Sequence, residues 1–67
     1  MSVKIRPYAA EQLREFGCET IEDIKLDSFN DSAFFSWLFD DDSLYGYDYD
    51  DLTEEQAEAF NELLSTF

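Results

Sequence analysis

The residues that could do chemistry in this 67-residue sequence are almost all carboxylates. Seventeen side chains are Asp or Glu, four are Lys or Arg, and none is His. Without histidine the usual proton carrier at neutral pH is missing, and paired carboxylates need a cleft with unequal environments to act as acid and base. A chain of this length has little room for such a cleft. We therefore expect a protein that is not an enzyme and that uses no cofactor.

The charge is concentrated in one part of the chain. All four basic residues, which are Lys4, Arg6, Arg14 and Lys25, lie in the first 25 positions. Residues 26–67 hold twelve acids and no base, so they contribute −12 of the formal net charge of −13. An acidic surface needed only for solubility usually mixes both signs. The asymmetry indicates a dedicated anionic surface, which we expect to bind neither nucleic acid nor an anionic membrane directly, because both carry phosphate.

The segment 40–52 combines this charge with tyrosine. Placing Asp41 first in an EF-hand-like loop puts Gly46 in the required sixth place, but it puts Leu52 where a bidentate Glu is needed. We therefore expect no metal site. The three tyrosines between the acids either pack on neighbouring helices or form part of a recognition surface, since tyrosine combines a rigid ring with a polar tip.

A stripe of acids follows on a predicted helix. Glu54, Glu58 and Glu62 are four residues apart, so their carboxylates repeat about every 6 Å along a helix, close to the spacing of phosphates along a nucleic-acid strand. No Lys or Arg is available to pair with them. Crowding of so many like charges predicts raised pKa values for several of these carboxyls. We predict a partner-binding surface within residues 40–62 that consists of Asp40, Asp41, Asp42, Tyr45, Tyr47, Asp48, Tyr49, Asp50, Asp51, Glu54, Glu55, Glu58 and Glu62.

The acidic runs Asp40-Asp41-Asp42, Asp48-Tyr49-Asp50-Asp51 and Glu54-Glu55 give the chain a family resemblance. In size and acidity it resembles the small phage-encoded inhibitors that mimic DNA, which include many anti-CRISPR proteins. The resemblance is compositional and covers about a third of the chain. It implies an inhibitor in the cytoplasm of the host bacterium that occupies the Lys/Arg-lined DNA channel of a defence complex, with a CRISPR effector as the favoured partner.

A second hypothesis comes from a different class of protein. In it the chain is a small acidic adaptor, antitoxin-like or anti-sigma-like, that binds a basic protein through an aromatic helix face. That hypothesis needs Phe35 and Phe39 on the surface, in an apolar patch. Both hypotheses leave open whether the chain is a monomer or a homodimer.

The elements that position these residues are short helices. We predict one small acidic domain over residues 1–67, mainly α, with three to four helices. Helical spacing of Ala9, Ala10, Leu13 and Phe16 before Gly17 predicts a first helix over residues 7–16. Thr20 is a predicted N-cap, and Ile21, Ile24 and Leu26 could line one side of a short second helix. The alternative is a strand over residues 22–26 paired with residues 2–6, which would make the fold α+β.

The remaining helices follow from hydrophobic patterning. Asp27 or Asn30 can cap a third helix that runs to about Phe39, in which Phe29, Ala33, Phe34, Trp37 and Leu38 form the apolar stripe at the centre of the core. Thr53 and Gln56 form a capping box for a last helix over residues 53–65. Its predicted inner face consists of Ala57, Phe60, Leu63, Leu64 and Phe67.

The single cysteine, Cys18, has no partner for an intramolecular disulfide. A small secreted domain usually carries several cysteines, so this composition favours a reducing compartment. We expect Cys18 to be a small buried residue.

Overall fold

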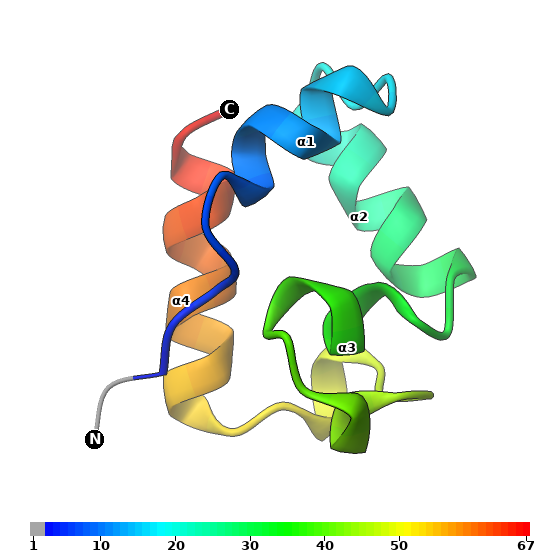
Figure 1. The fold of residues 1–67 in the computed structure, drawn as a ribbon, viewed down its shortest axis with the longest axis vertical. Helices are drawn as coiled ribbons and strands as arrows, with labels where there is room; N and C mark the ends of the chain where they lie inside the picture. Colours follow the sequence, from blue (N-terminus) through cyan, green and yellow to red (C-terminus); the bar gives the residue numbers. More distant parts are fainter. Residues whose placement is uncertain (1–2) are drawn as a thin grey trace.

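The computed structural model describes residues 3–67, which form four α-helices, two short 3-10 helices and no strand (Figure 1). The mainly α class is therefore confirmed for this part of the chain. The strand alternative is wrong over the described residues: residues 3–6 are extended without strand pairing, and residues 22–26 lie inside a helix. Ser2 lies outside the described residues. In chain order the elements are α1 (Ala9–Glu15), α2 (Ile21–Asn30), α3 (Phe34–Leu38), η1 (Asp42–Leu44), η2 (Tyr49–Asp51) and α4 (Glu54–Ser65).

The two longest helices begin at predicted threonine caps. The Thr20 hydroxyl accepts the backbone N–H of Asp23, whose carboxylate in turn accepts the backbone N–H of Thr20. Thr53 and Gln56 make the same reciprocal pair at the start of α4. Each pair satisfies two N–H groups that a helix start leaves without partners. This local bonding explains why the segment after Thr20 forms a helix and not a strand.

The predicted third helix is split in two. Neither Asp27 nor Asn30 is a cap, because α2 continues through both. The break comes at Asp31, which has an extended backbone and whose carboxylate accepts the N–H of Ala33. An aspartate side chain bonded to the backbone two residues on replaces the helical hydrogen bond at that point. The aromatic helix α3 is therefore only five residues long.

The short helix α3 is nevertheless the centre of the core, as predicted. Phe35 and Leu38 are completely buried, and Phe34 and Phe39 are nearly so. The rings of Phe34 and Phe35 meet Phe60 of α4 edge to face, at centroid distances of 6.1 and 5.3 Å. Such edge-to-face pairs add to the free energy gained from burial. From α4, the predicted inner-face residues Phe60, Leu63 and Leu64 are buried, and Ala57 and Phe67 are half-buried.

Four predicted apolar-face positions are exposed instead. Phe16, Ile21, Leu26 and Phe29 are 73%, 38%, 60% and 62% exposed. Phe29 and Leu26 are on the outer face of α2, because Ile24 and Ser28 point inward from that helix. Phe16 follows the last residue of α1, where Gly17 ends the helix with a φ of +100° that glycine adopts without strain. None of the described helices has the length and apolar character needed to cross a membrane.

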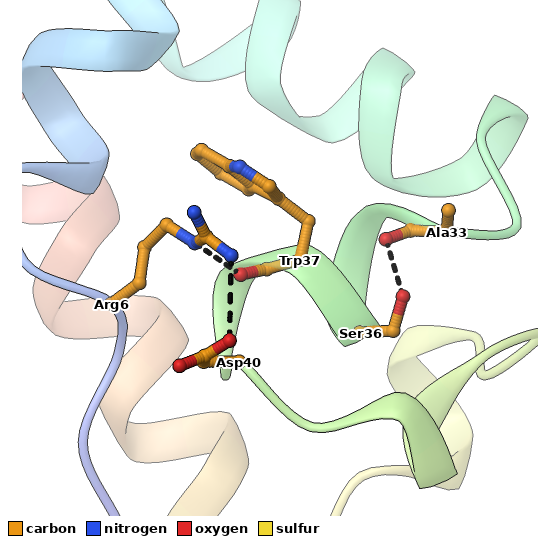
Figure 2. A network of polar contacts seen from close by, with 5 residues as sticks. All are labelled: Arg6, Ala33, Ser36, Trp37 and Asp40. Atoms are coloured by element: carbon orange, nitrogen blue, oxygen red, sulfur yellow. Dashed lines mark hydrogen bonds and ion pairs between the residues drawn. The ribbon is translucent and has the colours of Figure 1, made fainter.

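Arg6 attaches the N-terminal segment to the end of α3. Its backbone N–H donates to the carbonyl of Leu38, and its Nε donates to the carbonyl of Trp37, each at 2.7 Å. Figure 2 shows the guanidinium beside the Trp37 ring, with Cζ 5.0 Å from the ring centroid, and directed towards Asp40. The backbone of Arg6 thus satisfies the carbonyl of Leu38, and its side chain adds a second hydrogen bond to the carbonyl of Trp37, which also accepts the N–H of Asp40. The N-terminal segment runs alongside α4 (Figure 1).

Candidate functional site

The ten predicted carboxylates of residues 40–62 all lie on the surface. In Figure 1 the segment 40–52 occupies the end of the molecule at which α4 begins, and α4 then runs up one side. We call these ten acids the acidic surface. Its members are Asp40, Asp41, Asp42, Asp48, Asp50, Asp51, Glu54, Glu55, Glu58 and Glu62.

Two of these acids shape the loop that carries the others. The Asp41 carboxylate accepts both the hydroxyl and the backbone N–H of Ser43 at the start of η1. The Asp51 carboxylate accepts the backbone N–H of Asp48 across η2. Between the two turns Gly46 has a φ of +82° and donates its N–H to the carbonyl of Ser32. The predicted turn at Gly46 is confirmed, and these bonds hold the acids in a defined arrangement.

At two carboxyls, Asp23 and Asp41, the pKa shift has the opposite sign to the one expected from charge crowding. The hydroxyl and then the N–H of Ser43 lower the pKa of Asp41 below its ordinary value of 3.8. The N–H groups of Glu19 and Thr20, followed by the Thr20 hydroxyl, lower the pKa of Asp23 in the same way. Hydrogen bonds to a carboxylate favour its charged form. At these two positions local hydrogen bonds, and not repulsion, determine the pKa.

A loss of stability in acid follows from these lowered values. Because the folded-state pKa values of Asp23 and Asp41 lie below the unfolded value of 3.8, their contribution is complete above it and is lost as the pH falls through the folded values. We expect the free energy of unfolding to fall between about pH 5 and about pH 3. Urea titrations at several pH values measure this dependence. A D23A/D41A double variant should show a flatter profile over the same range, and an unchanged profile would contradict the assignment.

Asp40 differs from the other acids because it is paired. Its carboxylate lies 3.5 Å from a terminal nitrogen of Arg6. Its backbone has a φ of +52°, a left-handed conformation that aspartate tolerates better than most residues, and it reverses the chain after α3. Within residues 3–67 this is the one acid of the surface in an ion pair. Asp40 therefore belongs partly to the scaffold.

The three tyrosines of the segment have different positions. Tyr45 is 67% exposed, whereas Tyr47 and Tyr49 are half-buried against the core. The Tyr49 ring packs on Phe60 at 5.9 Å, and its hydroxyl accepts a hydrogen bond from Asn61. Tyr49 therefore ties the loop to α4, and Tyr45 is the tyrosine whose ring is available to a partner.

The glutamates of α4 point away from the core. Phe60, Leu63 and Leu64 define the buried side of this twelve-residue helix. A helix turns about 100° per residue, so Glu54, Glu58 and Glu62 lie on the opposite side. Their carboxylates make no hydrogen bond or ion pair within the described residues. The stripe predicted from the spacing is thus a continuous charged strip on the surface.

The remaining candidates are the thiol of Cys18, a cluster of metal ligands and the aromatic face of the second hypothesis. Cys18 is buried, and burial followed by a hydrogen bond to Asp27 raises its pKa to about 11, so the thiol is protonated at neutral pH. Among the described residues no three acids or cysteines come close enough to hold a metal ion. Phe35 and Phe39, on which the adaptor hypothesis depends, are buried. The aromatic face of that hypothesis is therefore inside the protein.

Sequence reasoning missed two acids that lie outside the acidic surface. Asp27 and Asp31 line a cavity together with Phe16, Phe34 and Trp37, which come from α3 and from the end of α1. Nothing local in the sequence indicated that aromatic rings from two other elements would face these two aspartates.

Comparison with protein-family models, with curated proteins and with solved structures gave no match to this chain. The functional argument therefore rests on the residues and geometry described above.

Proposed function

We propose that this protein is an inhibitor that mimics DNA and occupies the Lys/Arg-lined nucleic-acid channel of a host defence complex, with a CRISPR effector as the favoured target. The observation that carries the proposal is the acidic surface: ten exposed carboxylates between residues 40 and 62, within a stretch, residues 26–67, that contains no base. A positively charged channel built for phosphates also attracts carboxylates at similar spacing. The protein acts in this proposal from the cytoplasm of the host bacterium.

Three structural features support a preformed surface. The loop acids are held by the Asp41 and Asp51 hydrogen bonds, and the helix acids repeat along one side of α4. The loop is joined to α4 through Tyr49. A preformed polyanion loses little conformational entropy on binding, which favours affinity. Its association should be fast and sensitive to salt, because long-range attraction drives it.

A competition assay tests the proposal. A labelled DNA duplex is bound to each of a panel of purified CRISPR effector complexes and restriction enzymes at low salt, and the protein is titrated in. We expect displacement of DNA from at least one of them, with an inhibition constant that weakens steeply as salt increases. No displacement from any complex in the panel would contradict the proposal.

A matched pair of variants locates the binding surface. D42N/D50N/E58Q/E62Q removes four charges whose side chains have no bonding partner in the described residues, so the scaffold should persist. We expect it to weaken inhibition roughly tenfold or more, since an exposed charge pair contributes about 0.2–1 kcal/mol. The control E11Q/E15Q/E19Q/E22Q removes four exposed charges from the N-terminal part. Equal weakening by both variants would show that total charge, and not the acidic surface, is responsible.

A further inference from the structure

A cavity of about 310 Å³ lies between the end of α1, the second half of α2 and α3, outside the acidic surface. Aromatic rings form much of its wall. The Trp37 ring lies 6.3 Å from Phe16 and 6.2 Å from Phe34, in tilted arrangements. Phe16 is 73% exposed, and its ring stands at the rim of this cavity. The volume is large enough for one side chain and too small for most cofactors.

Two carboxylates lie in the same wall. One Asp27 oxygen, Oδ2, accepts the thiol hydrogen of Cys18 at 2.8 Å. One Asp31 oxygen, Oδ1, accepts the N–H of Ala33 at 2.9 Å. The second oxygen of each carboxylate has no hydrogen-bond partner within the described residues. These bonds fix both side chains and leave each with one acceptor available to a ligand.

Within the described residues, none of the side chains that line this cavity is basic. Lys4, Arg6 and Arg14 line a different cavity, between the N-terminal segment, α1 and α4, and Lys25 lines one between α2 and α4. From its own cavity Arg6 contacts one shared ring, with Cζ 5.0 Å from the centroid of Trp37, and this contact shows that Trp37 can stack with a guanidinium. The lining of the cavity therefore combines aromatic rings with two anionic acceptors and contains no base.

We propose that this cavity is a binding pocket for the guanidinium group of an arginine side chain from a partner protein. A planar guanidinium stacks on aromatic rings and donates to carboxylates along fixed directions, whereas a lysine ammonium is more strongly hydrated and has no plane to stack. The proposal extends the proposed function, because a Lys/Arg-lined channel supplies arginines. The pocket proposal depends on the proposed function only for the identity of the partner that supplies the arginine.

Trp37 gives a direct readout, because it is the only tryptophan of the chain. The probe is N-acetyl-arginine methylamide, titrated into the 67-residue protein while Trp37 emission and the indole N–H resonance are followed. We expect a saturable change with a dissociation constant in the millimolar range. The citrulline analogue, a neutral molecule of nearly the same shape, should give less than a tenth of that change. An equal response to citrulline would overturn the proposal.

Variants separate the pocket from general electrostatics. F16A removes an exposed ring, and D27N removes one charge with little change in shape, so we expect each to weaken arginine binding at least threefold. The control E22Q removes one exposed charge from a residue that belongs neither to this cavity nor to the acidic surface, and it should leave arginine binding unchanged. Loss of binding in E22Q to the same extent, or unchanged binding in both F16A and D27N, would contradict the pocket. The variants that test the acidic surface change none of the residues that line this cavity. A failure of the pocket proposal can therefore be distinguished from a failure of the proposed function.

Discussion

Replacing Phe35 with alanine is expected to remove a large part of the protein's free energy of unfolding. Phe35 is completely buried, and its ring meets Phe34 and Phe60 at 5.3 Å and Phe39 at 6.3 Å. Truncation of a buried phenylalanine costs about 3–5 kcal/mol, because burial and ring contacts are lost and a cavity is left. A domain of this size has a total stability of roughly 3–10 kcal/mol. Circular dichroism and Trp37 fluorescence in a urea titration measure the loss.

Two further substitutions serve as controls for this prediction. F35L keeps an apolar side chain of similar size and should lose much less stability than F35A. F29A removes an equally large ring from the outer face of α2, where the side chain is 62% exposed, and should change stability by about 0.5 kcal/mol or less. A urea midpoint for F35A equal to that of F29A would contradict the central position of α3 in the core.

The second large effect is expected at Arg6. R6M keeps the apolar stem but loses the Nε bond to the Trp37 carbonyl and the contact with the indole ring. A hydrogen bond from a charged donor contributes about 1.5–3 kcal/mol, and a cation–π contact about 0.5–1 kcal/mol at an exposed site. Because the lost groups act together, we expect a destabilisation of about 2–3 kcal/mol. Thermal unfolding measures it, and hydrogen exchange at the Arg6 amide reports whether the N-terminal segment detaches.

Comparison with R6K and D40N identifies which contact matters. Lysine keeps the charge near Asp40 but has no planar fork, so R6K should recover only a small part of the loss. D40N removes the ion pair, which is 81% exposed on the Asp40 side, and should cost less than about 1 kcal/mol. If R6K were as stable as the natural protein, the Trp37 carbonyl bond would not be the main contribution.

The elements that local sequence predicted correctly are those whose bonds are local. Thr20 and Thr53 bond to residues three positions away, so the N-cap pattern is readable along the chain. Gly17 and Gly46 have positive φ values at the turns where they were expected. Each of these signals involves only neighbouring residues, and tertiary contacts do not have to be known.

The misplacement of Phe29 occurred where one local bond changed the helical phase. The Asp31 carboxylate bonds to Ala33 and interrupts the helix expected up to Phe39. The predicted apolar stripe from Phe29 to Leu38 crosses this break. It therefore combines residues from two helices with different orientations. Phe29 therefore lies on the outside of α2, while Phe34 of α3 is buried. Periodicity predicted which segment forms the core but not which of its rings are inside.

For the candidate site, sequence alone determined that the ten acids of residues 40–62 are on the surface, because burying an unpaired carboxylate costs far more than a small domain can supply. Only the tertiary structure decided which of the neighbouring side chains are accessible to a partner protein. It buries Phe35 and Phe39, and it packs Tyr49 against Phe60. It also pairs Asp40 with Arg6 from the far end of the chain. Three separate elements meet to place Asp27 and Asp31 beside Phe16 and Trp37, since such contacts depend on how helices pack and not on spacing along the chain.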